Sequence, residues 1–232
     1  MAKNGKRYLD ASRRFDPERL HPAGEALDLV RTLATAKFDE TVELVVRLGV
    51  DPRRAEEMLR GTVALPAGTG KDVRIAVFAE GDAAAAARDA GADFVGGDDL
   101  AAEIDGGMMD FDVAIATPDM MPTVGRLGRV LGPRGLMPNP KTGTVTDDVA
   151  KAVEEFKGGR VEYRTDKQAN VHVPIGKVSF EPADLDRNLR AVMDELVRVR
   201  PAAAKGRYVK KMALSSTMGP GVNVDPGEFA VA

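Results

Sequence analysis

The chain has 232 residues, a hydrophobic fraction of 44% and a net charge of −3, which suit a folded protein of one large domain or two small ones. No apolar run reaches the roughly 18 residues of a membrane span, and the basic start MAKNGKRYLD has no apolar core, so neither a membrane segment nor a secretory signal is expected. The absence of cysteine excludes disulfides, thiolate catalysis and Cys-bound metals, and it favours a cytoplasmic location.

The charges are distributed unevenly along the chain. Residues 68–159 hold 9 Lys or Arg and 16 Asp or Glu, a balance of −7, whereas the rest holds 24 basic and 20 acidic residues, a balance of +4. An acidic middle between basic flanks predicts an inserted domain, with flanks that face a polyanion.

The N-terminal flank begins with a helical segment at 25–36. Residues 37–50 then alternate as in a strand, and Val45 and Arg47 point away from the face shared by Phe38, Glu40, Val42, Leu44, Val46 and Leu48. Asp51-Pro52 predicts the start of a short helix, and the sequence GTVAL predicts a further strand.

The middle of the chain alternates between strands and helices. Strands are predicted at 73–79, 92–97 and 111–117, and helices at 83–90, 98–104, 120–131 and from Thr146 or Asp147 to Phe156. Asp119 is placed to cap the helix at 120–131. This order predicts a parallel, Rossmann-like sheet with right-handed crossovers.

The C-terminal flank returns to strands around one long helix. Strands are predicted at 160–164, 169–175 and 208–214, with a helix from Pro182 to Val199. The flanks together predict an α+β domain with antiparallel pairs. The expected organisation is therefore an outer domain of residues 1–67 and 160–232 and an inserted α/β domain of residues 68–159.

Enzyme motifs are incomplete in this chain. GTGKD at 68–72 resembles half a phosphate loop but lacks the earlier Gly and the Ser or Thr after Lys71, and no G-x-G-x-x-G follows the strand at 73–79. His21 and His172 are far apart in sequence, the pair Asp98-Asp99 is explained by helix capping, and no G-x-S-x-G frames the hydroxyls at 215–217. We therefore expect no enzyme and no cofactor or metal.

The loop LGPRGLMPNPKTG at 131–143 has two interpretations. As structure it is a rigid crossover in which Leu136 and Met137 pack under the domain, because proline fixes the backbone. As function it is a stiff finger that presents Arg134 and Lys141 to a phosphate or a neighbouring protein. The sequence leaves its role open.

Features typical of RNA binding gather in the flanks. SSTMGPG at 215–221 places three hydroxyls, Ser215, Ser216 and Thr217, beside Met218, and then glycines that allow close backbone approach. Cations are supplied by Arg53-Arg54, Lys167 and Lys210-Lys211. Structured RNA is recognised by shape and by phosphate and 2′-OH contacts, which favours an RNA surface over a simple turn.

Several motifs in order resemble the bacterial large-subunit ribosomal protein L-one family, the protein of the mobile side stalk. They are ATAKFDETVE, GVDPRR, LGPRGLMPNPKTGTV, IGKVSF, AKGRYVKK and STMGPGV, and they extend over nearly the whole chain. The resemblance implies an outer domain that grips large-subunit rRNA and an inserted Rossmann-like domain. It also implies a cytoplasmic, ribosome-associated protein, monomeric when free, that helps deacylated tRNA leave the exit site and represses translation of its own operon mRNA.

The resemblance also implies which residues contact RNA. They are Lys37, Phe38, Glu40, Arg53, Arg54, Lys167, Thr217, Met218 and Gly219, to which the hydroxyl run adds Ser215 and Ser216. Two departures stand out: the family's run is usually all Thr, and the family commonly has Gly where this chain has Ala169. The alternative hypothesis is a protein that binds a small ligand, such as a nucleotide, in a cleft between the domains.

Overall fold

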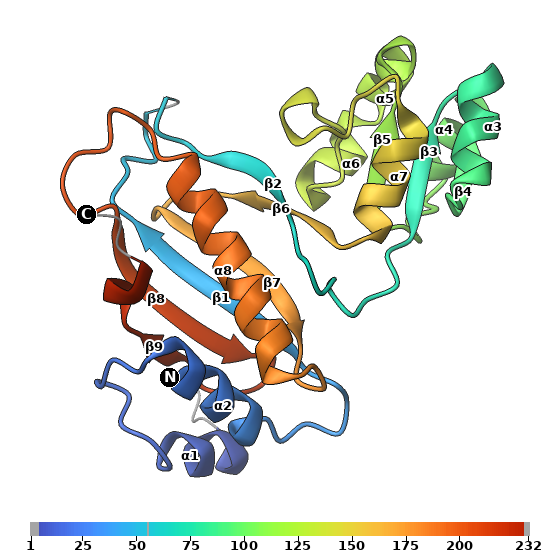
Figure 1. Cartoon of the computed structure of the whole chain (residues 1–232). Coiled ribbons are helices and arrows are strands. Elements are labelled where there is room, and N and C mark those ends of the chain that lie inside the picture. Colours follow the sequence, from blue (N-terminus) through green and yellow to red (C-terminus); the bar gives the residue numbers. More distant parts are fainter. Residues whose placement is uncertain (1–4, 55, 230–232) are drawn as a thin grey trace. The chain divides into compact units, whose positions relative to one another are not determined.

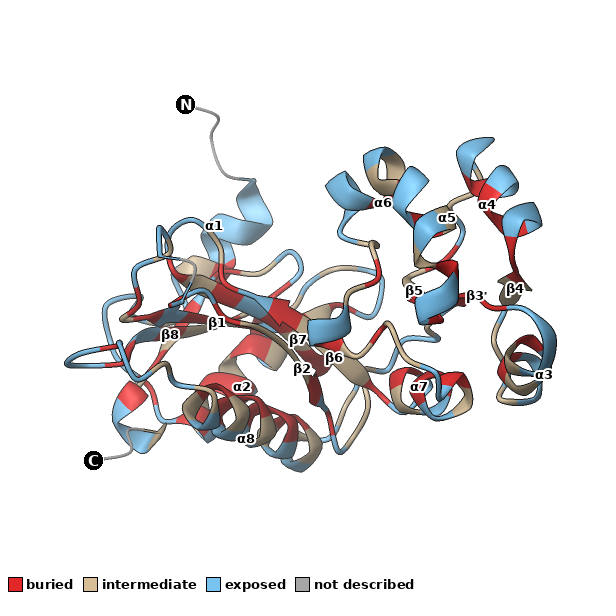
Figure 2. Cartoon of the chain, turned by 90° about the horizontal axis from the view of Figure 1, so that it is seen from above, coloured by how far each residue is buried: buried red, intermediate tan, exposed pale blue. Residues whose placement is uncertain are grey.

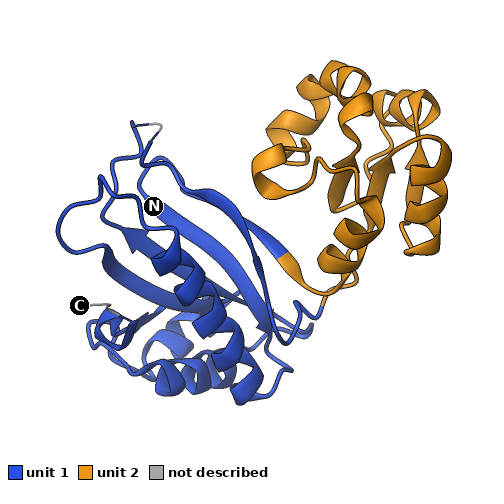
Figure 3. Ribbon diagram, turned by 45° about the horizontal axis from the view of Figure 1, so that its top comes forward, with its two compact units in different colours: residues 1–70, 161–232 blue, residues 71–160 orange. Residues whose placement is uncertain are grey.

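The computed structural model describes residues 5–54 and 56–229, which divide into two compact units (Figure 3). The first unit contains residues 1–70 and 161–232, and the second contains residues 71–160. The sequence predicted unit boundaries after residues 67 and 159, whereas the structure has them after residues 70 and 160. Figure 1 shows the helices and strands of both units.

The first unit is built on a four-stranded sheet in the order β7-β1-β8-β9. These strands are β1 (Thr41–Leu48), β7 (Asn170–Lys177), β8 (Val209–Ser216) and β9 (Val222–Val224). β1 is antiparallel to both β7 and β8, and β9 is antiparallel to β8. The expected antiparallel α+β class is confirmed for this unit.

Two helices cover one face of this sheet. α2 (Ala23–Leu33) and α8 (Pro182–Arg198) lie on the same side of it (Figure 2), and they pack against the alternate strand residues that are fully buried, such as Leu44, Val173 and Leu214. The other residues of β1, β7 and β8 form the opposite face, which is open to solvent at Glu43, Arg47, His172 and Lys211. The side-chain period of two thus separates a core face from an open face.

Smaller elements complete the first unit. They are α1 (Lys6–Ser12), the two-stranded sheet of β2 (Arg60–Ala64) and β6 (Arg160–Arg164), and a 3₁₀ turn at Pro226–Phe229. Ala11 of α1 is buried in the main core and Phe15 packs against it, so the helix is anchored to this unit.

The second unit is a parallel sheet between two helical layers. Its strands, β3 (Ile75–Phe78), β4 (Phe94–Gly96) and β5 (Val113–Ala116), lie in the order β4-β3-β5. Its helices are α3 (Gly81–Asp89), α4 (Asp98–Asp105), α5 (Met121–Arg126), α6 (Gly128–Arg134) and α7 (Val149–Lys157), with 3₁₀ turns at Pro118–Met120 and Pro140–Thr142. Ala76 and Phe78 face the core with α4 to α6, and Ile75 and Val77 face the core with α3 and α7. This confirms the expected parallel α/β class.

Three local predictions were wrong. The described residues after Asp51 form a turn and not the expected short helix, although the Asp51 side chain accepts the backbone N–H of Arg53 at 3.0 Å, as a helix N-cap would, and its carbonyl accepts that of Arg54. Asp119 caps nothing, since it lies inside the short 3₁₀ turn that precedes α5. The strand β9 was missed because its three residues are too short to show a period.

The loop at 131–143 combines a helix end with a second turn. α6 ends at Arg134 and is followed by the C-cap Gly135 (φ 75°), and Leu136 and Met137 pack against the core as the structural interpretation expected. The Asn139 side chain then accepts the N–H of Lys141 at 2.8 Å, and the buried Thr142 and Thr144 hydroxyls lie 3.0 Å apart. The loop is therefore held by hydrogen bonds and packing within the second unit.

Candidate nucleic-acid interface

A buried carboxylate joins the two segments that the sequence singled out. Glu40 is only 1% exposed, and its Oε2 accepts the Ser216 hydroxyl at 2.7 Å and the Met218 N–H at 2.9 Å. Its Oε1 accepts the Ala36 N–H at 2.9 Å. One side chain therefore fixes the turn before β1 to the turn after β8, although 176 residues separate Glu40 from Ser216.

The charge of Glu40 is stabilised by these bonds. Burial raises the pKa of this carboxyl, but the hydrogen bonds from the backbone N–H groups of Met218 and Ala36 and from the Ser216 hydroxyl outweigh burial and hold the pKa below its ordinary value. Glu40 is thus ionised at neutral pH and acts as a fixed acceptor inside the protein.

Glu40 and Ser216 are placed differently from the expectation. Both were predicted as RNA contacts, but Ser216 is 4% exposed and its hydroxyl already donates to Glu40. The alternation of β8 turns Leu214 and Ser216 toward the core and leaves Ser215 half-buried on the open face, opposite Glu43. Glu40 and Ser216 support the surface from beneath.

Thr217 and Gly219 also have roles within the protein. The Thr217 hydroxyl accepts the N–H of Thr41 at 3.0 Å and lies 3.4 Å from the Thr41 carbonyl, so its proton is directed to β1 rather than to a partner. A Cβ on Gly219 would stand 2.5 Å from the Ser216 hydroxyl, which explains why glycine fits at this position.

Above this network, apolar side chains face the solvent. Phe38 is 56% exposed and Met218 is 64% exposed, and Lys37 is exposed beside them. We call Lys37, Phe38, Thr217 and Met218, with Glu40 and Ser216 beneath them, the apolar end. Leaving a phenyl ring and a thioether in water is unfavourable, so these two side chains would gain from being covered.

The remaining predicted cations lie at the opposite end of β1. Arg53 and Lys167 line an open hollow of about 310 Å³ together with Arg47 and Lys210, and we call these four side chains the basic end. Within the described residues, no ion pair to a carboxylate involves any of them. β1 has eight residues and spans about 26 Å, so the structure divides one predicted site into two.

The turn that carries Lys167 is held by a second carboxylate. Asp166 Oδ1 accepts the backbone N–H groups of Gln168 at 2.7 Å and Asn170 at 2.8 Å. Ala169 has a positive φ of 64°, the conformation that favours glycine, and its carbonyl accepts the Leu48 N–H at 2.8 Å. The chain therefore keeps this turn despite the departure from the family's usual Gly.

Arg54 does not join the basic end. Its guanidinium lies 3.4 Å from Glu57 Oε1 and 3.8 Å from Asp51 Oδ2, so its charge is already balanced. Sequence reasoning missed Arg47 as a site residue, although the alternation of β1 had placed it on the open face. It named Lys210 only as a general source of charge, because nothing local shows that β8 begins beside Lys167.

Comparisons with known proteins show the family of this chain. A model described as the Ribosomal protein L1p/L10e family matches residues 30–220. The chain is also 60% identical to the large ribosomal subunit protein uL1 of Cutibacterium acnes over 224 residues, 97% of this chain and 97% of that protein. The chain belongs to this ribosomal protein family. The ribosomal family is structural, which confirms the prediction that the chain is not an enzyme.

In this ribosomal protein, residues weighed for catalysis have structural partners. Lys71 of the partial phosphate loop donates to Asp112 at 2.6 Å, and Asp99 accepts the N–H of Gly97 at the start of α4. His172 is exposed, with Nε2 3.7 Å from Asp166. The described residues contain no cluster of three or more His, Asp or Glu that could hold a metal, and none of the described helices is long and apolar enough to cross a membrane.

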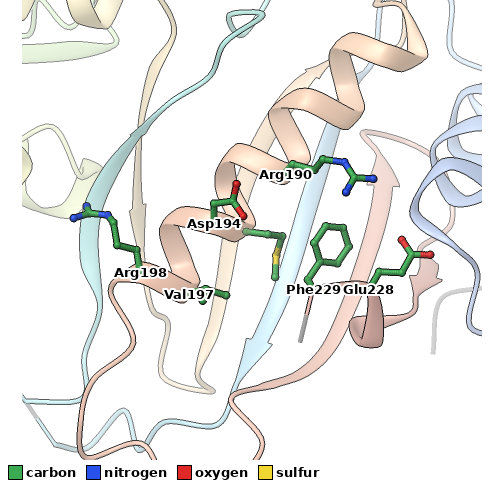
Figure 4. Close-up of a pocket in the computed structure, with 7 residues that line it drawn as sticks. Arg190, Asp194, Val197, Arg198, Glu228 and Phe229 are labelled. Carbon is green, nitrogen blue, oxygen red and sulfur yellow. The ribbon is translucent and has the colours of Figure 1, made fainter. Parts of the chain in front are cut away.

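A further hollow on α8 contains none of the predicted site residues. It is lined by Arg190, Asp194, Arg198 and Phe229, among others (Figure 4). Arg190 pairs with Asp186 at 2.7 Å and stacks over Phe229, and Arg198 pairs with Glu195. Its cations are already neutralised, so it offers less to a polyanion than either end of β1.

Proposed function

We propose that this protein is a component of the large ribosomal subunit and grips large-subunit rRNA through the apolar end of its first unit. The observation that carries the proposal is the exposure of Phe38 and Met218 on two turns that the buried Glu40 carboxylate holds together. The relative from Cutibacterium acnes is named as a large-subunit protein, which supports the ribosomal part of the proposal.

The chemistry of the apolar end suits the sugar face and the unstacked bases of folded RNA. An aromatic ring stacks on a base, and a thioether packs against a ribose. The Thr217 O–H donates toward the Thr41 carbonyl and its oxygen accepts the Thr41 N–H, so one acceptor lone pair remains for a ribose 2′-OH. This surface recognises shape, because its groups are held in place before RNA arrives.

The basic end supplies a second, less specific contact. Arg47, Arg53, Lys167 and Lys210 offer four cations without carboxylate partners among the described residues. Such groups bind phosphates irrespective of the base sequence. We propose that this end contacts RNA backbone beyond the part that the apolar end grips.

Two finer functions rest on the family resemblance. We propose that the protein assists the release of deacylated tRNA from the exit site, and that as a free monomer it represses translation of its own operon mRNA. Repression of this kind needs the mRNA and the rRNA to bind the same surface. The apolar end suits this role, because its side chains are held in a defined arrangement that two similar RNA structures can both fit.

The rRNA proposal is tested by filter binding of the full chain to a stalk fragment of large-subunit rRNA. Replacing Met218 by Ala is expected to weaken binding by about fivefold or more, since a buried contact of this size is worth at least about 1 kcal/mol. The matched control is Met58→Ala, because Met58 is also exposed (37%) but lines neither end of β1. Equal binding by both variants and the wild type would contradict the proposal.

The mRNA proposal predicts competition. A fragment of the operon mRNA should be displaced by the rRNA fragment, and Met218→Ala should weaken both complexes by the same factor. If the mRNA fragment binds in the presence of saturating rRNA fragment, the shared surface is wrong. For the tRNA role, ribosomes carrying Arg53→Ala with Lys167→Ala should release exit-site tRNA more slowly than wild type, and an unchanged or faster rate would exclude the basic end from assisting release.

A further inference from the structure

The N-terminal helix completes a pocket at the apolar end. Arg7 and Tyr8 of α1 line an open cavity of about 440 Å³ together with Lys37, Phe38 and Met218. This volume lies in the usual range of small-molecule sites. Neither Arg7 nor Tyr8 was predicted as a site residue, because nothing local in MAKNGKRYLD shows that the segment meets a turn 30 residues later.

The exposed apolar side chains are concentrated around this cavity. Among the described residues, the large hydrophobic side chains that remain exposed are Tyr8, Leu9, Leu20, Phe38, Met58 and Met218. Three of the six, Tyr8, Phe38 and Met218, line the one cavity. Two aromatic rings and a thioether that line one hollow form an apolar slot. Exposed side chains scattered over the surface would not form one.

The charges around the slot are of one sign. Arg7 and Lys37 are exposed and line the cavity, no Asp or Glu lines it, and neither cation has an ion-pair partner among the described residues. The nearby carboxylate of Glu40 is buried and its oxygens already accept three hydrogen bonds. An apolar slot with a cationic edge complements a group that is flat and apolar but attached to a phosphate.

We propose that this pocket receives a single unpaired nucleobase of the bound RNA, stacked against Tyr8 and Phe38 with its phosphates near Arg7 and Lys37. An unpaired base has two apolar faces, and its phosphates are charge-complementary to the two cations. The inference rests on the proposed rRNA binding and adds to it the place of one base. It also assigns α1 to the interface.

The slot is held open by contacts independent of RNA. Ala11 and Phe15 fix α1 and the segment after it to the core of the first unit, while Glu40 fixes Ala36 and Met218. Both walls are therefore in place before binding, which lowers the entropic cost of capturing the base.

The first test measures binding of the full chain to the stalk rRNA fragment. Tyr8→Ala is expected to weaken binding by roughly 5- to 150-fold, the range for loss of one base–aromatic stack, whereas Tyr8→Phe should bind like wild type. Leu9→Ala is the matched control, because Leu9 is 43% exposed on the same helix but does not line the cavity. Circular dichroism confirms that each variant is folded.

The second test is ultraviolet cross-linking of the wild-type complex, followed by trypsin digestion. Tyr8 lies in the peptide 8–13 and Phe38 in the peptide 38–47. The proposal expects the same nucleotide, located by sequencing the RNA, to be joined to both peptides. Cross-links to the peptide 38–47 alone would overturn it, because the base would then lie outside the slot.

The outcomes separate this inference from the proposed function. If the wild type does not bind the rRNA fragment, the proposed function itself is wrong and the base slot falls with it. If Met218→Ala weakens binding but Tyr8→Ala and Leu9→Ala both bind like wild type, only the base slot is wrong. A Tyr8→Ala protein that binds rRNA normally but is lost from assembled subunits would indicate a protein partner, and it would also overturn the proposal.

Discussion

The two ends of β1 are two different kinds of surface. At the apolar end a buried carboxylate with three hydrogen-bond donors holds an exposed ring and a thioether in place. At the basic end four cations surround a shallow polar hollow, and the Asp166 turn fixes only the backbone that carries Lys167. Packing contacts demand a defined shape, whereas charges act over several ångströms in any orientation. The first end is therefore suited to specificity and the second to affinity that depends on salt.

The largest expected effect comes from Glu40→Gln. A glutamine places an NH₂ group where a carboxylate oxygen accepted a backbone N–H, so at least one buried donor loses its partner and the two turns separate. We expect a loss of about 3 kcal/mol in the free energy of unfolding, measured by urea denaturation, together with loss of rRNA binding. Glu43→Gln is the control, since Glu43 is an exposed carboxylate three residues further along, on β1. Similar effects of the two changes would remove the distinction between the ends.

The pH dependence of stability tests the same network. Because the pKa of Glu40 is lower in the folded protein, its stabilising contribution is complete above the unfolded-state pKa, near 4.5, and is lost as the pH falls through the lower folded-state pKa. The difference in unfolding free energy between the wild type and Glu40→Gln should therefore shrink below about pH 4.5. A difference that stays constant down to pH 3 would show that the ionised form is not what the donors require.

A smaller loss is expected from Gly219→Val. The new Cβ would stand 2.5 Å from the Ser216 hydroxyl, which is fixed by its bond to Glu40 and cannot move without breaking that bond. We expect about 1–3 kcal/mol of destabilisation and weaker rRNA binding. Gly221→Val is the control, because a Cβ there meets nothing within 4 Å. Equal melting temperatures for the two variants would show that the turn can rearrange.

Changes at the basic end should act on salt dependence more than on fold. Replacing both Arg53 and Lys167 by Ala removes two cations, so the slope of the logarithm of the binding constant against the logarithm of salt should decrease by about 2 in magnitude. Phe38→Ala should weaken binding without changing this slope. Filter binding of both proteins over a series of KCl concentrations measures the two slopes. An unchanged slope in the double variant would exclude the basic end from phosphate contact.

The smallest effect is expected at Ala169. Glycine relieves the positive φ of 64° but increases the entropy of the unfolded chain and removes a buried methyl group, so these terms nearly cancel. Ala169→Gly should therefore change the unfolding free energy by less than about 1 kcal/mol and leave rRNA binding unaffected. Ala169→Val is the contrast, since a β-branched residue is strongly disfavoured at this φ. A large gain in affinity with glycine would mean that the alanine distorts the Lys167 turn.

Much of the fold could be predicted because the signals are local. The alternation from Val42 to Leu48 predicts which face of β1 is buried, and the order of strands and helices in residues 73–156 predicts a parallel sheet. The same locality explains the errors. Asp51 accepts the N–H of Arg53 as it would in an Asx turn or at a helix N-cap, so the local pattern does not distinguish the two, and β9 was too short for a period.

By itself, the sequence determined the fold class, the two faces of the sheet and the residue types that suit RNA, because each depends on neighbours a few positions apart. Only the tertiary structure decided that Glu40 and Ser216 lie beneath the surface, that the cations form a separate end about 26 Å away, and that Tyr8 joins Phe38 and Met218. The physical reason is that sheet pairing joins segments as far apart as Glu40 and Met218, and no periodic pattern records which side chains meet across such a distance.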